Sequence, residues 1–141
     1  MSDGTFKPVS NSSEKRLYGP RKLLLCGFSS ESQDKMGVFL EMIGMADIDR
    51  VWALPGDGEK TVGELMGLSN DTGRGIDSGL PRAVIMAGIT EKELHLLVDS
   101  CRRAGMRQTL FATLTPVSEK WSLGDLLREL GCEREALADP S

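Results

Sequence analysis

The sequence predicts a small α/β domain with three layers, a β-sheet covered by helices on both faces. Short apolar runs alternate with stretches in which apolar residues recur at helical spacing, the pattern of alternating strands and helices. The composition, 40% hydrophobic and 27% charged, is that of an ordinary globular protein. A chain of 141 residues fits a single hydrophobic core, because single domains cluster at roughly 100–150 residues.

Residues 1–20 predict a disordered tail, since they are rich in Ser, Gly, Pro and charge and have no hydrophobic period. The continuous apolar run 22–28 then predicts a strand buried on both faces. Ser30 and Gln33 have the spacing of a capping box, which predicts a helix from Ser30 to Gly44. Its inner face would consist of Met36, Phe39, Leu40 and Ile43.

A second, shorter strand is predicted over 50–54, where RVWAL is followed by a Pro-Gly turn. Thr61 and Glu64 have the spacing to cap a short helix, although glycines interrupt it. Residues 68–80 are mostly turn-forming residues and predict a flexible, glycine-rich loop.

Residues 82–87 predict a third strand, again buried on both faces. Thr90 and Glu93 form a second capping box, and the helix that they open would end at Gly105. Its inner face would consist of Leu94, Leu97, Val98 and Cys101.

Residues 109–114 predict a fourth strand, and Ser122 begins a last helix that ends at Gly131. The domain is expected to span 21–137, with a disordered end over 138–141. Alternating strands and helices indicate a mainly parallel four-stranded sheet, for which we predict the order 2-1-3-4. This is a flavodoxin-like order that lacks the last strand.

The composition excludes several functional classes. No apolar run approaches the roughly 20 residues needed to cross a bilayer, and no export signal precedes the domain, so we expect a cytoplasmic protein that does not bind membranes. The net charge of −4 is distributed along the chain and argues against nucleic-acid binding. Three cysteines without a CxxC pair and a single histidine are too few to predict a disulfide framework, a metal site or a cofactor.

If a ligand binds, we expect it at the carboxyl edge of the sheet, at the switch between strands one and three. Two predicted helices begin at this edge, and helix N-termini favour anions. The candidate ligand-binding residues are Ser29, Ser30, Gly88, Thr90, Thr113, Thr115 and Lys120. The alternative is that the serines and threonines among them act only as helix caps.

The sequence gives little support for a catalytic site. Cys26 lies near the end of the first strand, where some phosphatases have a nucleophile, but the Arg that such loops need six residues later is replaced by Ser32. The strand ends lack the carboxylates of a receiver domain. Gly73, Gly75 and Gly79 follow a helix instead of a strand, the reverse of a dinucleotide-binding turn. His95 is expected on a solvated helix surface.

Three segments, KLLLCGFSS, PRAVIMAGITEKELHLLVDSCRRAG and LFATLTPVSEKWSLGDLLREL, together resemble a bacterial domain-of-unknown-function family, number 3783. The resemblance extends over 22–137 except for the glycine-rich loop. It depends on the Pro-Arg-Ala entry to the third strand and on Thr115, Pro116, Trp121, Leu126 and Leu127. It implies a compact bacterial α/β domain and assigns no activity and no site residue.

The sequence does not identify a function. Our first expectation is a non-catalytic regulatory or protein-interaction domain that binds a protein partner or forms a homodimer. In such a domain, Trp52 and Trp121 either anchor the partner or pack in the core. The alternatives are a binder of a small anionic ligand at the carboxyl edge of the sheet and, less favoured, thiol or phosphoryl chemistry at Cys26.

Overall fold

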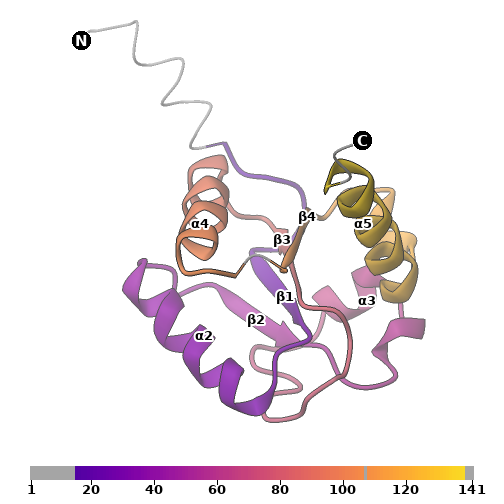
Figure 1. Cartoon of the computed structure of the whole chain (residues 1–141), viewed down its shortest axis with the longest axis horizontal. Coiled ribbons are helices and arrows are strands. Elements are labelled where there is room, and N and C mark those ends of the chain that lie inside the picture. Colours follow the sequence, from indigo (N-terminus) through magenta and orange to yellow (C-terminus); the bar gives the residue numbers. More distant parts are fainter. Residues whose placement is uncertain (1–14, 107, 139–141) are drawn as a thin grey trace, which may run out of the picture.

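The computed structural model describes residues 15–106 and 108–138 (Figure 1). Four strands form one open sheet in the order β2-β1-β3-β4, which confirms the predicted order. They are β1 (Lys22–Cys26), β2 (Asp49–Trp52), β3 (Ala83–Ala87) and β4 (Leu110–Thr113). The outer pairs, β1 with β2 and β3 with β4, are parallel, so the sheet is mainly parallel as expected.

The central pair, β1 and β3, is antiparallel, and here the structure departs from the flavodoxin-like arrangement. Within each half of the chain, a helix joins two neighbouring strands, and such crossovers return the chain in the same direction. The connection from β2 to β3 runs from residue 53 to 82 and includes its own helical turns. A connection of this length can enter the sheet from either end, and the pattern of apolar residues does not distinguish the two directions.

Helices cover both faces of the sheet, which confirms the three predicted layers (Figure 1). On one face lie α2 (Ser30–Met42) and α4 (Glu91–Arg103). On the other lie α3 (Val62–Met66) and α5 (Leu123–Ala138), and the 3-10 turns η1 (Asp57–Glu59) and η2 (Ser118–Lys120) precede them. α5 continues past Gly131, where the prediction ended it.

The predicted helix caps are confirmed with one correction. Thr61 and Thr90 each form a complete capping box, with Glu64 and Glu93 respectively. The cap of α2 is Ser29 and not Ser30, because Ser29 has extended backbone angles and its hydroxyl accepts a hydrogen bond from the Ser32 amide at 3.2 Å.

Both faces of the central strands are buried, which explains their continuous apolar runs. Leu24 and Ile85 pack toward α3 and α5, and both are 0% exposed. The neighbouring Leu23 and Val84 point the other way, into the core beneath α2 and α4. Trp52 also belongs to this second core and is 1% exposed, so its role is packing.

The two halves of the chain have the same order of elements: strand, helix, strand, 3-10 turn, helix. Each residue of 20–66 corresponds to the residue 61 positions later in 81–127, without a gap. Identical residues occur at eight of these positions: Pro20/Pro81, Arg21/Arg82, Gly27/Gly88, Gly44/Gly105, Met45/Met106, Pro55/Pro116, Gly63/Gly124 and Leu65/Leu126. The chain therefore contains a tandem repeat, which the sequence analysis did not predict.

An approximate twofold axis relates the two repeats and passes through the centre of the sheet. Leu24 pairs with Ile85, its own counterpart in the other repeat. On the α3/α5 face, the Val62 amide donates to the Trp121 carbonyl at 2.9 Å, and the equivalent Leu123 amide donates to Lys60 at 2.8 Å. The antiparallel central pair is thus a consequence of this symmetry.

Residues 15–20, which the sequence analysis assigned to the tail, lie against the domain. The Leu17 amide donates to the Ile89 carbonyl at 2.8 Å, and the Gly88 amide donates to Tyr18 at 3.0 Å. The rest of the predicted tail, residues 1–14, lies outside the described residues, as do residues 139–141.

The 68–80 loop is attached to the domain at several points. Beside the edge strand β2, the Asp71 amide donates to Arg50 at 2.6 Å, and the Trp52 amide donates to Thr72 at 2.8 Å. The Gln33 side chain accepts from the Gly75 amide at 2.6 Å. The predicted flexibility of this loop stays a prediction.

Candidate functional site

The antiparallel central pair separates the residues predicted to form a ligand site. Ser29 and Ser30 follow β1, whereas Gly88 and Thr90 follow β3, and Cys26 at the end of β1 lies opposite Ala83 at the start of β3. The two groups are therefore at opposite ends of strands that are roughly 13 Å long. Thr113 ends β4, and Thr115 and Lys120 follow it, at the Gly88 end. The predicted convergence at one edge is wrong.

Several of these residues have local structural partners. Ser29 and Thr90 cap α2 and α4. The Thr115 hydroxyl accepts from the Ser118 amide at 2.9 Å and holds the turn η2. Gly88 has a φ of 65°, and a Cβ at this position would lie 2.5 Å from the Arg21 nitrogen, so only glycine fits here. The interpretation of the hydroxyl residues as helix caps and turn formers accounts for these contacts.

The buried thiols are poor nucleophiles. Burial, with a smaller contribution from the Asp57 charge, raises the pKa of Cys26 to about 12. Burial likewise raises the pKa of Cys101 to about 11. His95 is exposed on α4, as predicted. Among the described residues, no cluster of His, Cys, Asp and Glu could hold a metal ion, and no helix is long and apolar enough to span a membrane.

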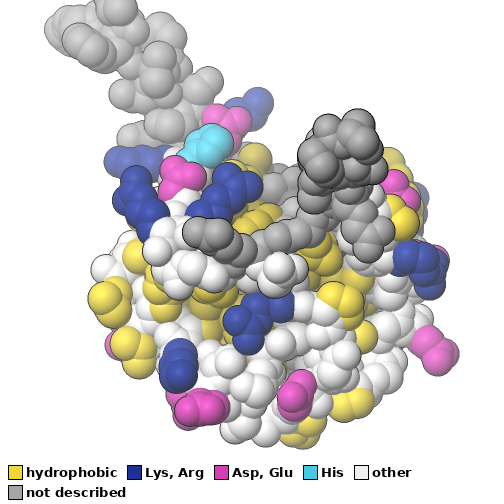
Figure 2. Space-filling view, viewed as in Figure 1, with side chains coloured by type: hydrophobic (Ala, Val, Ile, Leu, Met, Phe, Trp, Pro, Cys, Tyr) yellow, Lys and Arg dark blue, Asp and Glu magenta, His cyan; other side chains and the backbone are white. Residues whose placement is uncertain are grey.

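A cavity of about 260 Å³ lies between α2 and the end of α4. Figure 2 shows hydrophobic side chains reaching the surface over this region, with Lys and Arg side chains among them. The apolar walls are formed mainly by Phe28, Met36, Phe39 and Met106. The polar lining consists of Ser32, Lys35 and Arg82. The lining thus contains two cationic side chains and no carboxylate.

Arg82 is the half-buried charge of this cavity. It follows Pro81 and precedes β3, so its backbone is held between a rigid residue and the sheet. Its guanidinium carbon lies 4.6 Å from the centre of the Phe28 ring, and its Nη2 donates to the Ser32 Oγ at 3.3 Å. Lys35 stands at the rim, where its ammonium group lies 3.9 Å from exposed Glu31.

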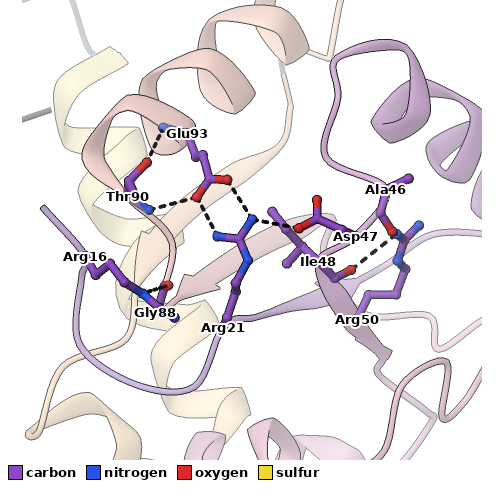
Figure 3. Close-up of polar contacts among 9 residues, drawn as sticks. All are labelled: Arg16, Arg21, Ala46, Asp47, Ile48, Arg50, Gly88, Thr90 and Glu93. Atoms are coloured by element: carbon purple, nitrogen blue, oxygen red, sulfur yellow. Dashed lines mark hydrogen bonds and ion pairs between the residues drawn. The ribbon is translucent and has the colours of Figure 1, made fainter. Parts of the chain in front are cut away.

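The equivalent arginine of the first repeat, Arg21, has a different environment (Figure 3). Its guanidinium donates to both oxygens of Glu93, at 2.6 and 2.7 Å, and to Asp47 at 3.1 Å. Arg21 is the main cause of the lowered pKa of Glu93, about 2, and Glu93 in turn raises the pKa of Arg21. The Thr90 amide also donates to Glu93, at 3.0 Å, so this carboxylate is held from two sides.

Equivalent positions in the two repeats show which acidic partners Arg82 lacks. The counterpart of Glu93 is Ser32, and the counterpart of Asp47 is Gln108. In the part of the chain that the structure describes, Arg82 has no ion pair. A guanidinium group binds carboxylate and phosphate groups in a bidentate manner, so this cavity can hold an anion that carries an apolar group.

Arg82 and the cavity were not predicted from the sequence. Comparing the chain with itself at a separation of 61 residues would have aligned the two Pro-Arg pairs and shown Ser32 where the other repeat has Glu93. The contacts between the repeats, which bring Arg82 to α2, require the three-dimensional structure.

Residues 82–137 match the model of a family described as Domain of unknown function (DUF3783). The matched region contains β3, α4, β4 and nearly all of α5, so it covers the second repeat from Arg82 onward and continues along α5. The match does not extend to residues 22–67, over which a resemblance was also predicted. Comparison with curated proteins and with solved structures finds no match. The predicted resemblance is therefore confirmed for residues 82–137, over which the chain is similar to the DUF3783 family.

Proposed function

We propose that this protein is a non-catalytic ligand-binding domain that holds a small organic anion in the Arg82 cavity. One observation carries the proposal: Arg21 is neutralised by Glu93, whereas Arg82 faces Ser32 in a cavity without a carboxylate. Such a domain suits the regulatory role expected from the sequence.

The Arg21–Glu93 ion pair indicates which chemical group would bind to Arg82. Ser32 is shorter than glutamate, and it lines the cavity beside Arg82. A ligand carboxylate bound there would accept two hydrogen bonds from Arg82, as the Glu93 carboxylate does from Arg21. The ligand takes the place of an internal carboxylate.

The walls of the cavity restrict the rest of the ligand. Phe28, Met36, Phe39 and Met106 favour an aromatic or branched aliphatic body, which would exclude water from the ion pair. The volume of about 260 Å³ is just below the usual range of ligand pockets, roughly 300–1,000 Å³, and limits the ligand to a small molecule.

Calorimetric titration tests this proposal with benzoate, 4-methylpentanoate and phenyl phosphate as probes and benzamide as the neutral control. Arg82→Gln is expected to weaken binding about 10- to 150-fold, because it removes hydrogen bonds to a charged group. Ser32→Glu is expected to weaken binding as strongly, because its own carboxylate would occupy Arg82.

The matched control is Arg102→Gln, which removes an exposed arginine of α4 and leaves the cavity unchanged. Equal affinities in the parent protein, Arg82→Gln and Ser32→Glu would refute the site. If none of the three anionic probes binds more tightly than neutral benzamide, the proposed ligand class is wrong.

We also retain protein interaction in the cytoplasm of a bacterial cell as a second candidate. Tyr18, Val117 and Trp121 are 45%, 65% and 38% exposed, and the Tyr18 hydroxyl donates to Glu119, which lies between the other two in the sequence; this candidate uses the three side chains as one interaction surface. A self-associating protein would sediment as a dimer, and Trp121→Ser would return it to a monomer. The buried thiols Cys26 and Cys101 suit a reducing compartment.

A further inference from the structure

We infer that the two repeats, 20–66 and 81–127, are two copies of one unit that pair through a self-complementary surface, as in a homodimer whose subunits have become fused. The natural partner of this surface is another copy of the same unit. The connection between the repeats is therefore not required for them to associate.

The first part of this surface is the central strand pair. Leu24 lies opposite its counterpart Ile85, and Leu23 lies opposite Met86 while Leu25 lies opposite Val84. Because Met86 is the counterpart of Leu25 and Val84 that of Leu23, exchanging the two repeats leaves every pair in place. This is the geometry of an isologous interface.

The second part lies where α3 and α5 begin. Thr61 and Ser122, which are counterparts, form an antiparallel bridge. A Cβ added to Gly63 would lie 3.0 Å from the Glu119 carbonyl oxygen, and one added to Gly124 would lie 3.1 Å from that of Gly58. Glycine occurs at both equivalent positions because the backbone of the other repeat comes close to each.

The third part is the segment before each central strand, which crosses to the other repeat. The backbone of Arg21 contacts Gly88, and the backbone of Arg82 contacts Gly27. The arginine side chains also contact the other repeat: Arg21 donates to Glu93 in the second repeat, and Arg82 donates to Ser32 in the first.

One repeat alone would be incomplete. It would have a two-stranded sheet, which is marginal in water, and the edge of its inner strand would be exposed along residues that are fully buried in the pair. The DUF3783 match covers one such unit. Pairing is what supplies each unit with a four-stranded sheet and two layers of helices.

Cleavage of the connection tests the inference in the full chain. A protease recognition sequence inserted between Asp77 and Ser78, in the 68–80 loop, allows the folded protein to be cut, and the uncut protein is the control. After cutting, the two fragments should elute as one species of the original size. The melting temperature of the cut protein should fall on dilution, because unfolding now separates two molecules, whereas that of the uncut protein should not change.

Two matched variants locate the interface. Gly124→Val places a side chain against Gly58 of the other repeat, whereas Gly131→Val adds the same side chain to the same helix at a position where a Cβ would lie more than 4 Å from atoms outside the helix's own backbone. In the cut protein, the fragments should dissociate at a concentration at least tenfold higher with Gly124→Val than with Gly131→Val, and Gly124→Ala is the milder replacement if the valine variant does not fold. Fragments that separate or precipitate at micromolar concentration after cutting would overturn the inference, as would equal effects of the two substitutions.

Discussion

Arg21 and Arg82 occupy equivalent positions in the two repeats, after a proline and before a central strand. Arg21 is held by the carboxylates of Glu93 and Asp47, and it joins the segment before β1 to α4. Arg82 stacks on Phe28, donates to Ser32 and borders a cavity. The same position of one fold is thus closed where two acidic side chains, Glu93 and Asp47, pair with the arginine, and open where uncharged Ser32 and Gln108 replace them.

The largest effect should come from the side chains on the twofold axis. Leu24→Ala and Ile85→Ala are each expected to lower the free energy of unfolding by about 2–5 kcal/mol, because both side chains are fully buried and their loss leaves a cavity. Urea unfolding measures both. As counterparts in the same strand pair, they should both fall within this range. Leu96→Ala, on the exposed face of α4, is the control, and a similar loss there would contradict the assigned core.

Glu93→Gln should cause the next largest loss in the free energy of unfolding, about 1–3 kcal/mol, because it leaves half-buried Arg21 without its bidentate partner. The loss should depend on pH. Since the pKa of Glu93 is lowered from 4.5 to about 2 in the folded protein, its contribution is complete above about pH 5 and disappears as the pH falls toward 2. Urea unfolding at several pH values should therefore give curves for the parent and Glu93→Gln that converge in acid. A constant difference down to pH 2 would mean that the charge of Glu93 is not what stabilises the pair.

Ser32→Glu should make the second repeat resemble the first, and it is expected to add about 0.5–1.5 kcal/mol to the free energy of unfolding by pairing with Arg82. The gain should be absent when Arg82→Gln is also present. A double-mutant cycle measured by urea unfolding at neutral pH separates this pair from other effects of the substitution. A gain that persists without Arg82 would show that the new carboxylate acts elsewhere, for example at the N-terminus of α2.

The smallest effect should be that of Arg82→Gln, below about 0.5 kcal/mol in the absence of ligand, since Arg82 has no ion pair among the described residues. The equivalent Arg21→Gln should cost several times more. Thermal unfolding without ligand measures both substitutions. If the two losses were equal, Arg82 would have a structural role like that of Arg21, and the proposed site would lose its main support.

Much of the fold could be predicted from local patterns. The apolar runs of β1 and β3 indicated strands buried on both faces, and the capping boxes at Thr61 and Thr90 marked where α3 and α4 begin. The cap of α2 was placed one residue too late, at Ser30, because Gln33 gives Ser30 the spacing of a capping box, whereas in the structure the Gln33 side-chain amide donates to the Phe28 and Ile76 carbonyls. The candidate site was misplaced for a different reason. Its residues were assigned to one edge on the assumption that all four strands run in the same direction.

From the sequence alone, the strands and helices could be located, because hydrophobic period and helix caps act over a few neighbouring residues. The layers and the strand order followed from the alternation of strands and helices. Three features needed the folded structure: β3 runs opposite to β1, Ser29 and Thr90 lie at opposite ends of the sheet, and Arg82 reaches α2 of the other repeat. These features depend on contacts between residues about 50–60 positions apart, as between Ser32 and Arg82 or Leu24 and Ile85. The pairing of the two repeats determines these features together. When both central strands are buried in one symmetric pair, the direction of β3 and the positions of Arg21 and Arg82 are fixed at the same time.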